Sequence, residues 1–242
     1  MSHQFFKAII ATSEHFDFAP LICSEMEASA KARGTGIAKR SPEYLQQKMA
    51  EGKAVIAFSA EGEWAGFCYI ETWSHEQYVA NSGLIVSPDF RKGGVARLIK
   101  QRIFELSRSK YPEAKLFGLT TGLAVMKINS ELGYEPVTYS ELTSDDAFWA
   151  GCRSCVNYDI LMNKERKNCL CTAMLYDPEE QQQIVVQTPE MLRRREKFAG
   201  FLNEKWQKMR ERALRLLRKD ALALSGGLDT AIYHLANSED HA

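Results

Sequence analysis

Short apolar runs alternate along the first 176 residues with segments whose apolar positions recur every three or four residues. Runs of this length are typical of strands, and the spaced segments are typical of amphipathic helices. The predicted strands cover residues 4–11, 54–59, 64–72, 82–86, 116–121, 137–142 and 169–176. The predicted helices cover residues 20–32, a segment beginning at Pro42 with Ser41 as its cap, 95–108 and 123–132. This order of elements predicts an α+β domain.

One stretch joins a strand directly to a helix through paired glycines. Ser82–Val86 is a predicted buried strand, and Gly93 and Gly94 precede a helix whose apolar residues recur at helical spacing. A glycine turn at a helix N-terminus exposes unpaired backbone N–H groups, which favour an anion such as a pyrophosphate. A tight strand-to-helix turn with solvated basic residues is the alternative.

Composition indicates an ordinary globular protein. The chain has 242 residues, 45% hydrophobic and 26% charged, which suits one domain and an appendage. Its formal net charge is zero, so we expect neither a nucleic-acid partner nor an anionic membrane partner. Residues 5–11 are too short for a signal peptide, so a cytoplasmic location is expected, in which the six cysteines are thiols or metal ligands rather than disulfides.

The run from Val86 to Ala96, VSPDFRKGGVA, resembles motif A of the GNAT superfamily of acyl-CoA-dependent N-acyltransferases. That motif is Q/R-x-x-G-x-G/A after a strand ending in Val-x-Pro, and Arg91, Gly94 and Ala96 match its three positions. The resemblance covers residues 1–176. It implies the GNAT fold, a central, mixed, mostly antiparallel twisted sheet of about seven strands flanked by helices. It also implies acetyl-CoA or another acyl-CoA as cofactor and direct acyl transfer in a ternary complex.

The same resemblance implies the residues that hold the cofactor. Backbone groups of the glycine turn would bind the pyrophosphate, and N–H groups at the end of the preceding strand would polarise the acyl carbonyl. These cofactor-binding residues are Ile85, Val86, Arg91, Lys92, Gly93, Gly94, Val95 and Ala96. Asn129 stands where many relatives carry a tyrosine that protonates the departing thiolate. An amide can hydrogen-bond the cofactor sulfur but is no useful acid, so water, another residue or poor catalysis remain open.

For the general base, the segment after the third predicted strand offers Glu71, His75 and Glu76. Glu71 is the first choice because a carboxylate at the end of a central strand would lie beside the acyl carbonyl. The alternative for each residue is an ordinary solvated side chain.

The loop between the first two helices, which the family places over the acceptor amine, is basic. Arg33, Lys39 and Arg40 in this loop can pair with carboxylates, so we expect a small-molecule amine that bears a carboxylate. Residues 27–40 and the later cysteines resemble a bacterial GNAT subgroup linked to arginine biosynthesis and N-acylglutamate synthesis, which makes glutamate the sharpest candidate. A solvated basic face is the alternative, and an acyl-CoA-binding module without turnover is the alternative function.

A cysteine-rich insertion, residues 143–171, separates the last two predicted strands. Cys152 and Cys155 form a C-x-x-C pair, and Cys169 and Cys171 form a C-x-C pair placed in the following strand. Four thiols in this spacing could close a structural zinc site, since four thiolates leave no open position for a substrate. The alternative is that they are small buried apolar residues.

Residues 177–242 form a predicted C-terminal helical extension to the domain of residues 1–176. A long amphipathic helix is predicted from Pro189 to about Leu222, with an apolar stripe that would dock on the domain or form a homodimer. A membrane-surface role for this basic helix is the less favoured alternative. Ser225–Thr230, SGGLDT, resembles the PP-loop of ATP pyrophosphatases such as argininosuccinate synthase, against the alternative of a Gly-Gly helix terminus.

Overall fold

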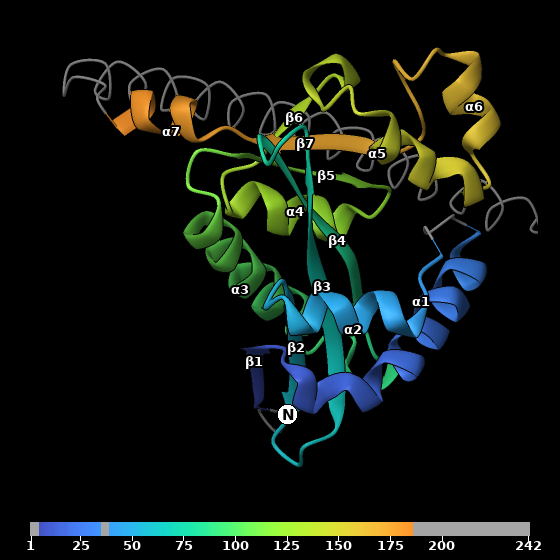
Figure 1. Ribbon diagram of the computed structural model, residues 1–242, viewed down its shortest axis with the longest axis vertical. Coiled ribbons are helices and arrows are strands. Elements are labelled where there is room, and N and C mark those ends of the chain that lie inside the picture. The colour runs from blue at the N-terminus through green and yellow to red at the C-terminus, as the bar shows by residue number, and fades with distance from the viewer. Residues whose placement is uncertain (1–4, 35–38, 186–242) are drawn as a thin grey trace, which may run out of the picture. The chain divides into compact units, whose positions relative to one another are not determined.

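A seven-stranded sheet forms the centre of the described residues, which are 5–34 and 39–185 of the computed structural model (Figure 1). The spatial order of its strands is β1-β2-β3-β4-β5-β7-β6, and β4 with β5 is the parallel pair. The other neighbours are antiparallel. The strands are β1 Phe6–Ile10, β2 Ala54–Ser59, β3 Trp64–Trp73, β4 Tyr78–Val86, β5 Lys115–Thr120, β6 Glu135–Val137 and β7 Thr172–Tyr176. The predicted mixed, mostly antiparallel sheet is confirmed.

The helices begin where local chemistry favours them. Ser41 Oγ accepts a hydrogen bond from the Tyr44 backbone N–H at 3.2 Å, and Pro42 takes the first helical position, as predicted. The helices are α1 Ala19–Arg33, α2 Pro42–Ala50, α3 Val95–Lys110, α4 Leu123–Glu131, α5 Asp146–Ala150, α6 Tyr158–Asn163 and α7 Pro178–Val185. The chain divides into two units, Met1–Gln182 and Gln183–Ala242.

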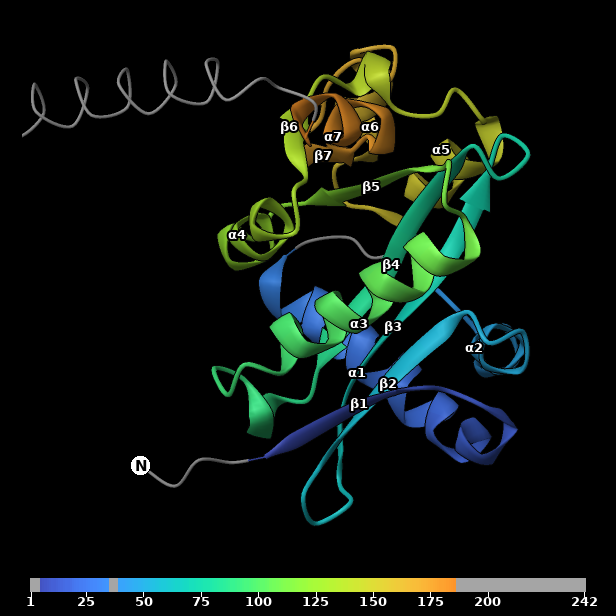
Figure 2. The same cartoon turned by 90° about the vertical axis from the view of Figure 1, so that its left-hand side faces the viewer.

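Side chains of β2 and β3 alternate between two hydrophobic cores. Ile56 and Phe67 pack with α1 and α2 on one face, whereas Val55 and Ile70 pack with α3 on the other. Figure 2 shows α2 and α3 on opposite sides of β3. A third core joins β5 and β7 to the cysteine-rich insertion through Phe117 and its neighbours. The insertion therefore has a small core of its own against the sheet.

The sheet is interrupted between β4 and β5. Their pairing consists of three registered pairs and ends at Ala80 opposite Phe117, although β4 continues to Val86. On its other side β4 carries an irregularity opposite residues 67–69 of β3, where Gly83 has φ 65°. A Cβ on Gly83 would lie 2.3 Å from the Tyr69 ring, so glycine is required there. The second half of β4 therefore pairs with β3 but not with β5.

Two predicted strands differ from the structure. The strand predicted at 137–142 is wrong beyond Val137, because Thr138 and Glu141 form a capping box that turns the chain into a 3₁₀ segment. The strand predicted at 169–176 begins at Thr172, so the C-x-C pair precedes it. The prediction that the C-x-C pair lies in this strand is therefore wrong.

Two further predictions concern other parts of the chain. The helix predicted at 189–222 and the Ser225–Thr230 motif lie outside the described residues. Among the helices that the structure describes, none is both long enough and apolar enough to span a membrane.

Candidate functional site

The turn after β4 leads into α3 through a left-handed glycine. Gly94 has φ 87° and is the N-cap of α3, and a Cβ there would meet nothing within 4 Å. Gly93 is confined instead, because its Cβ would lie 3.1 Å from the Phe6 ring. Within the described chain the backbone N–H groups of Val95, Ala96 and Arg97 have no acceptor, as at any uncapped helix start. This turn presents donors and open space together, which suits a phosphate oxygen.

The basic residues of the turn have different roles. Arg91 bonds back to the protein: its Nε donates to Val86 O at 3.3 Å and its Nη2 to Glu25 Oε1 at 3.0 Å. Arg97 forms a two-pronged ion pair with Glu131 of α4. Lys92 is exposed and takes part in no ion pair among the described residues. Lys92 is therefore the turn residue whose charge is available to a bound anion.

The free edge of β4 runs into this turn. Among the residues that the structure describes, no strand pairs with residues 81–86 on the β5 side, and this edge includes Ile85 and Val86. The Ile85 side chain is buried with α1 and α2, and the Val86 carbonyl accepts the bond from Arg91. The two residues predicted to polarise an acyl carbonyl thus lie on this strand edge, a few residues before the open helix start at Gly94.

A buried ion pair joins β3 to the segment preceding α2. Glu71 is 6% exposed, and its Oε1 accepts hydrogen bonds from Arg40 Nη2 at 3.1 Å and Tyr44 Oη at 2.5 Å. Arg40 Nε donates to Tyr69 Oη at 2.8 Å. Burial and the hydrogen bond to Glu71 raise the pKa of Tyr44, so its hydroxyl stays a donor. Burial also lowers the pKa of Lys48, whose Nζ lies 5.1 Å from the centre of the Tyr44 ring.

Two residues predicted separately, Glu71 as base and Arg40 as acceptor ligand, are thus in contact. All three guanidinium nitrogens of Arg40 donate within the chain, the third to Lys39 O at 3.2 Å. Tyr44 and Tyr69 complete the cluster and were missed in the sequence. The signal for Tyr69 was its position two residues before Glu71 on one strand face.

The remaining predicted site residues lie apart from this cluster. His75 and its neighbour Glu76 are both exposed at the tip of the β3–β4 hairpin, and His75 has φ 54°. Arg33 Nη1 donates to Ser29 Oγ at 2.6 Å, and the exposed Lys39 pairs with Glu27 at 3.3 Å. The roles of these side chains stay predictions.

Asn129 is 2% exposed and faces β5 and β7. Its Nδ2 donates to the Met174 sulfur at 3.7 Å, and its Oδ1 has no partner in the described chain. A Cβ on Gly118 would lie 3.8 Å from Nδ2, so the amide lies against β5. Burying an oxygen without a hydrogen-bond partner costs free energy of folding, so Asn129 stays a candidate site residue. It lies beside β5, on the side of the sheet where the β4–β5 pairing is interrupted.

A buried polar network on the α3 face was also missed. Asn81 is the first β4 residue beyond the β5 pairing; it accepts from Tyr134 Oη at 3.1 Å and donates to Ser107 Oγ at 2.8 Å. Lys100 is 3% exposed, its Nζ lies 5.3 Å from the Tyr134 ring centre, and burial lowers its pKa. The helical period places Lys100 on the buried face beside Ile99. Polar side chains therefore gather where β4 and β5 separate.

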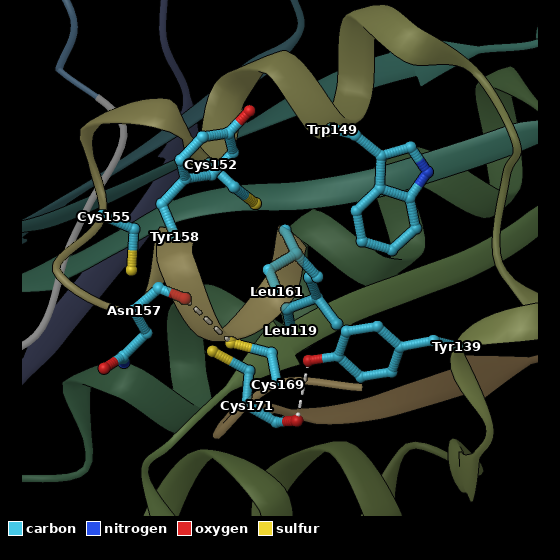
Figure 3. A pocket seen from close by; sticks show the side chains of 10 residues that line it. All are labelled: Leu119, Tyr139, Trp149, Cys152, Cys155, Asn157, Tyr158, Leu161, Cys169 and Cys171. Carbon is cyan, nitrogen blue, oxygen red and sulfur yellow. Dashed lines mark hydrogen bonds between the residues drawn. The ribbon is translucent and has the colours of Figure 1, made fainter. Parts of the chain in front are cut away.

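The four clustered cysteines line one cavity of about 30 Å³ (Figure 3). Burial raises the pKa of Cys152 to about 11, and burial with the neighbouring thiols raises that of Cys171 to about 12. In the part of the chain that the structure describes, no three His, Cys, Asp or Glu side chains are arranged closely enough to hold a metal ion. The C-x-x-C and C-x-C pairs are brought together as predicted from their spacing, but they are not in a coordinating arrangement.

Comparisons with known proteins give the fold. No family model and no curated protein matches the chain. An N-acetylglutamate synthase from Neisseria gonorrhoeae, solved with coenzyme A and N-acetylglutamate, is 19% identical over 72% of this chain, with TM-score 0.50. The match covers 35% of that enzyme, so this chain corresponds to about a third of its length.

Two shorter proteins match over nearly their whole length. A Mycobacterium tuberculosis protein in complex with coenzyme A is 16% identical, with TM-score 0.51; 71% of this chain and 98% of that one are covered. A Salmonella typhimurium protein with its cofactor acetyl-CoA is 11% identical, with TM-score 0.50; the coverage is 72% and 94%. Likeness at these identities establishes a common fold.

Proposed function

We propose that this chain, which has the GNAT fold, is an acyl-CoA-dependent N-acyltransferase acting on a small, carboxylate-bearing amine. The observation that carries the proposal is the end of β4–β5 pairing at Ala80, followed along the chain by the open helix start at Gly94. The diphosphate of an acyl-CoA would bind the N–H groups of Val95 and Ala96. The pantetheine arm would follow the free edge of β4.

The proposed reaction is one displacement in a ternary complex. The acceptor amine, having lost a proton, attacks the thioester carbonyl; a C–N bond forms, the C–S bond breaks and the thiolate takes a proton. The Ser87 N–H donates to Ala65 O on the β3 side, so the Val86 N–H points to the free edge, where it would stabilise the developing oxyanion. Both donors to Glu71 bind Oε1, and no described group donates to Oε2. Oε2 is thus the atom that would accept the ammonium proton, directly or through water.

For the acceptor we propose glutamate or a similar amino acid. Its carboxylates would pair with Arg33 and Lys39, which are exposed, whereas Arg40 is half-buried and uses three of its five N–H donors within the chain. The likeness in fold to an enzyme solved with N-acetylglutamate supports a trial of glutamate before other amines.

The experiment measures cofactor binding first and turnover second. Isothermal titration with coenzyme A, acetyl-CoA and pantetheine should show binding of the first two and much weaker binding of pantetheine, which lacks the diphosphate. Lys92→Ala should weaken coenzyme A binding about fivefold, the scale of one exposed ion pair. Lys110→Ala, at the opposite end of α3, is the matched control and should leave the affinity unchanged. Absence of coenzyme A binding by the wild-type chain would end the proposal.

Turnover is then measured as thiol release over a panel of amino acids and amines. We expect release with glutamate or another anionic amine and none with polyamines. Asn129 favours a second candidate, an acyl-CoA-binding module without catalysis, because no acid stands at that position. That candidate predicts coenzyme A binding with no thiol release for any amine.

A further inference from the structure

We propose that Cys152, Cys155, Cys169 and Cys171 bind one structural Zn²⁺ and fasten the cysteine-rich insertion to the sheet. All four side chains line a single cavity, although they come from two segments of the chain on either side of α6 (Figure 3). The other two cysteines, Cys23 and Cys68, lie in α1 and β3 and do not line it. The proposal does not depend on the acyltransferase assignment.

The backbone holds both cysteine pairs toward this cavity. The Cys155 N–H donates to Cys152 O at 2.9 Å, which closes the C-x-x-C turn. On the opposite side, Tyr139 Oη donates to Cys171 O at 2.9 Å, and the Cys169 thiol donates to Asn157 O at 3.8 Å. These bonds fix the two cysteine segments on either side of the cavity.

The size and lining of the cavity select the occupant. About 30 Å³ is the room of one water molecule or one ion, too small for an amino-acid substrate. Besides the cysteines, the lining is largely aromatic and aliphatic and includes Leu119, Trp149 and Leu161. A water would find few partners there, whereas a cation with four sulfur ligands needs none. Sulfur ligands in C-x-x-C spacing favour zinc over oxygen-preferring cations.

The thiols stand around the cavity without coordinating. Rotation about χ1 moves each sulfur between staggered positions while the backbone stays in place, which is the adjustment that coordination requires. Binding of Zn²⁺ by four thiols forms four Zn–S bonds and releases up to four protons to solvent. Occupancy is therefore expected to fall as the pH falls.

A cross-link would add to the small core that holds the insertion against the sheet. The insertion's helices α5 and α6 have 5 and 6 residues, too short to be stable by themselves. The insertion also holds the β3–β4 hairpin: the Ser74 N–H donates to Asp145 Oδ2 at 3.3 Å, and the Ser74 and Thr143 hydroxyls lie 2.8 Å apart. Zinc would thus fix the end of the strand that carries Glu71.

The test uses the full chain purified under reducing conditions. Elemental analysis should give one zinc per chain, and X-ray absorption should show about four sulfur neighbours at about 2.3 Å. Cys152→Ser and Cys171→Ser should each lower the zinc content at least fivefold, whereas Cys23→Ser, a half-buried thiol on α1, should keep one zinc per chain. A chelator should remove the zinc and lower the melting temperature, and added Zn²⁺ should restore it.

Three outcomes would overturn the proposal. One is wild-type protein that carries no zinc and takes up none when Zn²⁺ is added. Another is an absorption spectrum dominated by nitrogen or oxygen neighbours. The third is a disulfide between any two of the four cysteines in freshly purified reduced protein. Because the first two measurements are made on the wild-type chain, a cysteine variant that fails to fold leaves the proposal open to refutation.

Discussion

Arg40 Nη2 donates a hydrogen bond to Glu71 Oε1 across 3.1 Å, and this pair ties the segment before α2 to the middle of the sheet. The Arg40 and Glu71 side chains are 19% and 8% exposed, so solvent screens the pair only slightly. The contact joins the residue proposed as base to the basic segment proposed to cover the acceptor. It is therefore both a structural bond and the main electrostatic contact of the proposed base.

Glu71→Gln should separate these two roles. The amide still accepts from Tyr44, but it leaves the Arg40 charge without a counterion, so the free energy of unfolding should fall by about 2 kcal/mol. If Glu71 is the base, thiol release should fall about a hundredfold with coenzyme A affinity unchanged. Glu76→Gln, on the exposed hairpin tip, is the matched control and should change neither quantity. Turnover retained in the folded Gln variant would remove Glu71 as base.

The irregularity in β4 should tolerate no side chain. Gly83→Ala places a Cβ 2.3 Å from the Tyr69 ring and 2.8 Å from the Met26 methyl at φ 65°, so we expect a loss of about 2–4 kcal/mol in chemical unfolding. Gly94→Ala has a similar positive φ with open space around it, and should cost only about 1–2 kcal/mol. Equal losses for the two variants would mean that the contact with Tyr69 does not constrain Gly83.

The buried Lys100 should make stability depend on pH. Burial lowers the pKa of Lys100, so protonation opposes folding. The penalty is complete below the folded-state pKa and disappears as the pH rises past the ordinary value of 10.5. Lys100→Met should therefore melt several degrees higher than wild type at pH 7, with a smaller difference at pH 10. Calorimetry at both pH values checks this. Cys68 and Tyr134 are present in both proteins, so their own titration cancels to first order in the comparison.

Asn129→Leu should distinguish packing from cofactor contact. The substitution removes a buried oxygen that has no partner in the described chain, so the free energy of unfolding should rise by about 1 kcal/mol. If the amide also binds the cofactor sulfur, thiol release should fall although the protein is more stable. Higher stability with unchanged turnover would show that Asn129 has no part in the reaction.

Local chemistry made much of the fold predictable. The helix start at Ser41-Pro42 and the glycine turn at Gly93-Gly94 depend on neighbours within a few residues, and both were placed correctly. The alternation of β2 and β3 is likewise a property of consecutive side chains. From these elements the order of strands and helices could be predicted, whereas the mixed seven-stranded sheet was implied by the resemblance of residues 86–96 to the GNAT motif.

The candidate site was decided by contacts between distant residues. Nothing local requires Arg40 to pair with Glu71, since they lie on different elements and meet only when α2 packs on β3. The same holds for the end of β4–β5 pairing at Ala80 and for the close approach of Gly83 to the Tyr69 ring, which both depend on how strands pack in the folded chain. The strand predicted from residue 169 failed for this reason too, since the Cys171 carbonyl accepts from the distant Tyr139 hydroxyl. The strand predicted at 137–142 failed for a local reason, because the Thr138–Glu141 capping box outweighs strand propensity. Backbone preferences depend on residues close together in the sequence, so the sequence alone determines them. Burial and ion pairing depend on which surfaces the folded chain brings together, so only the tertiary structure determines them.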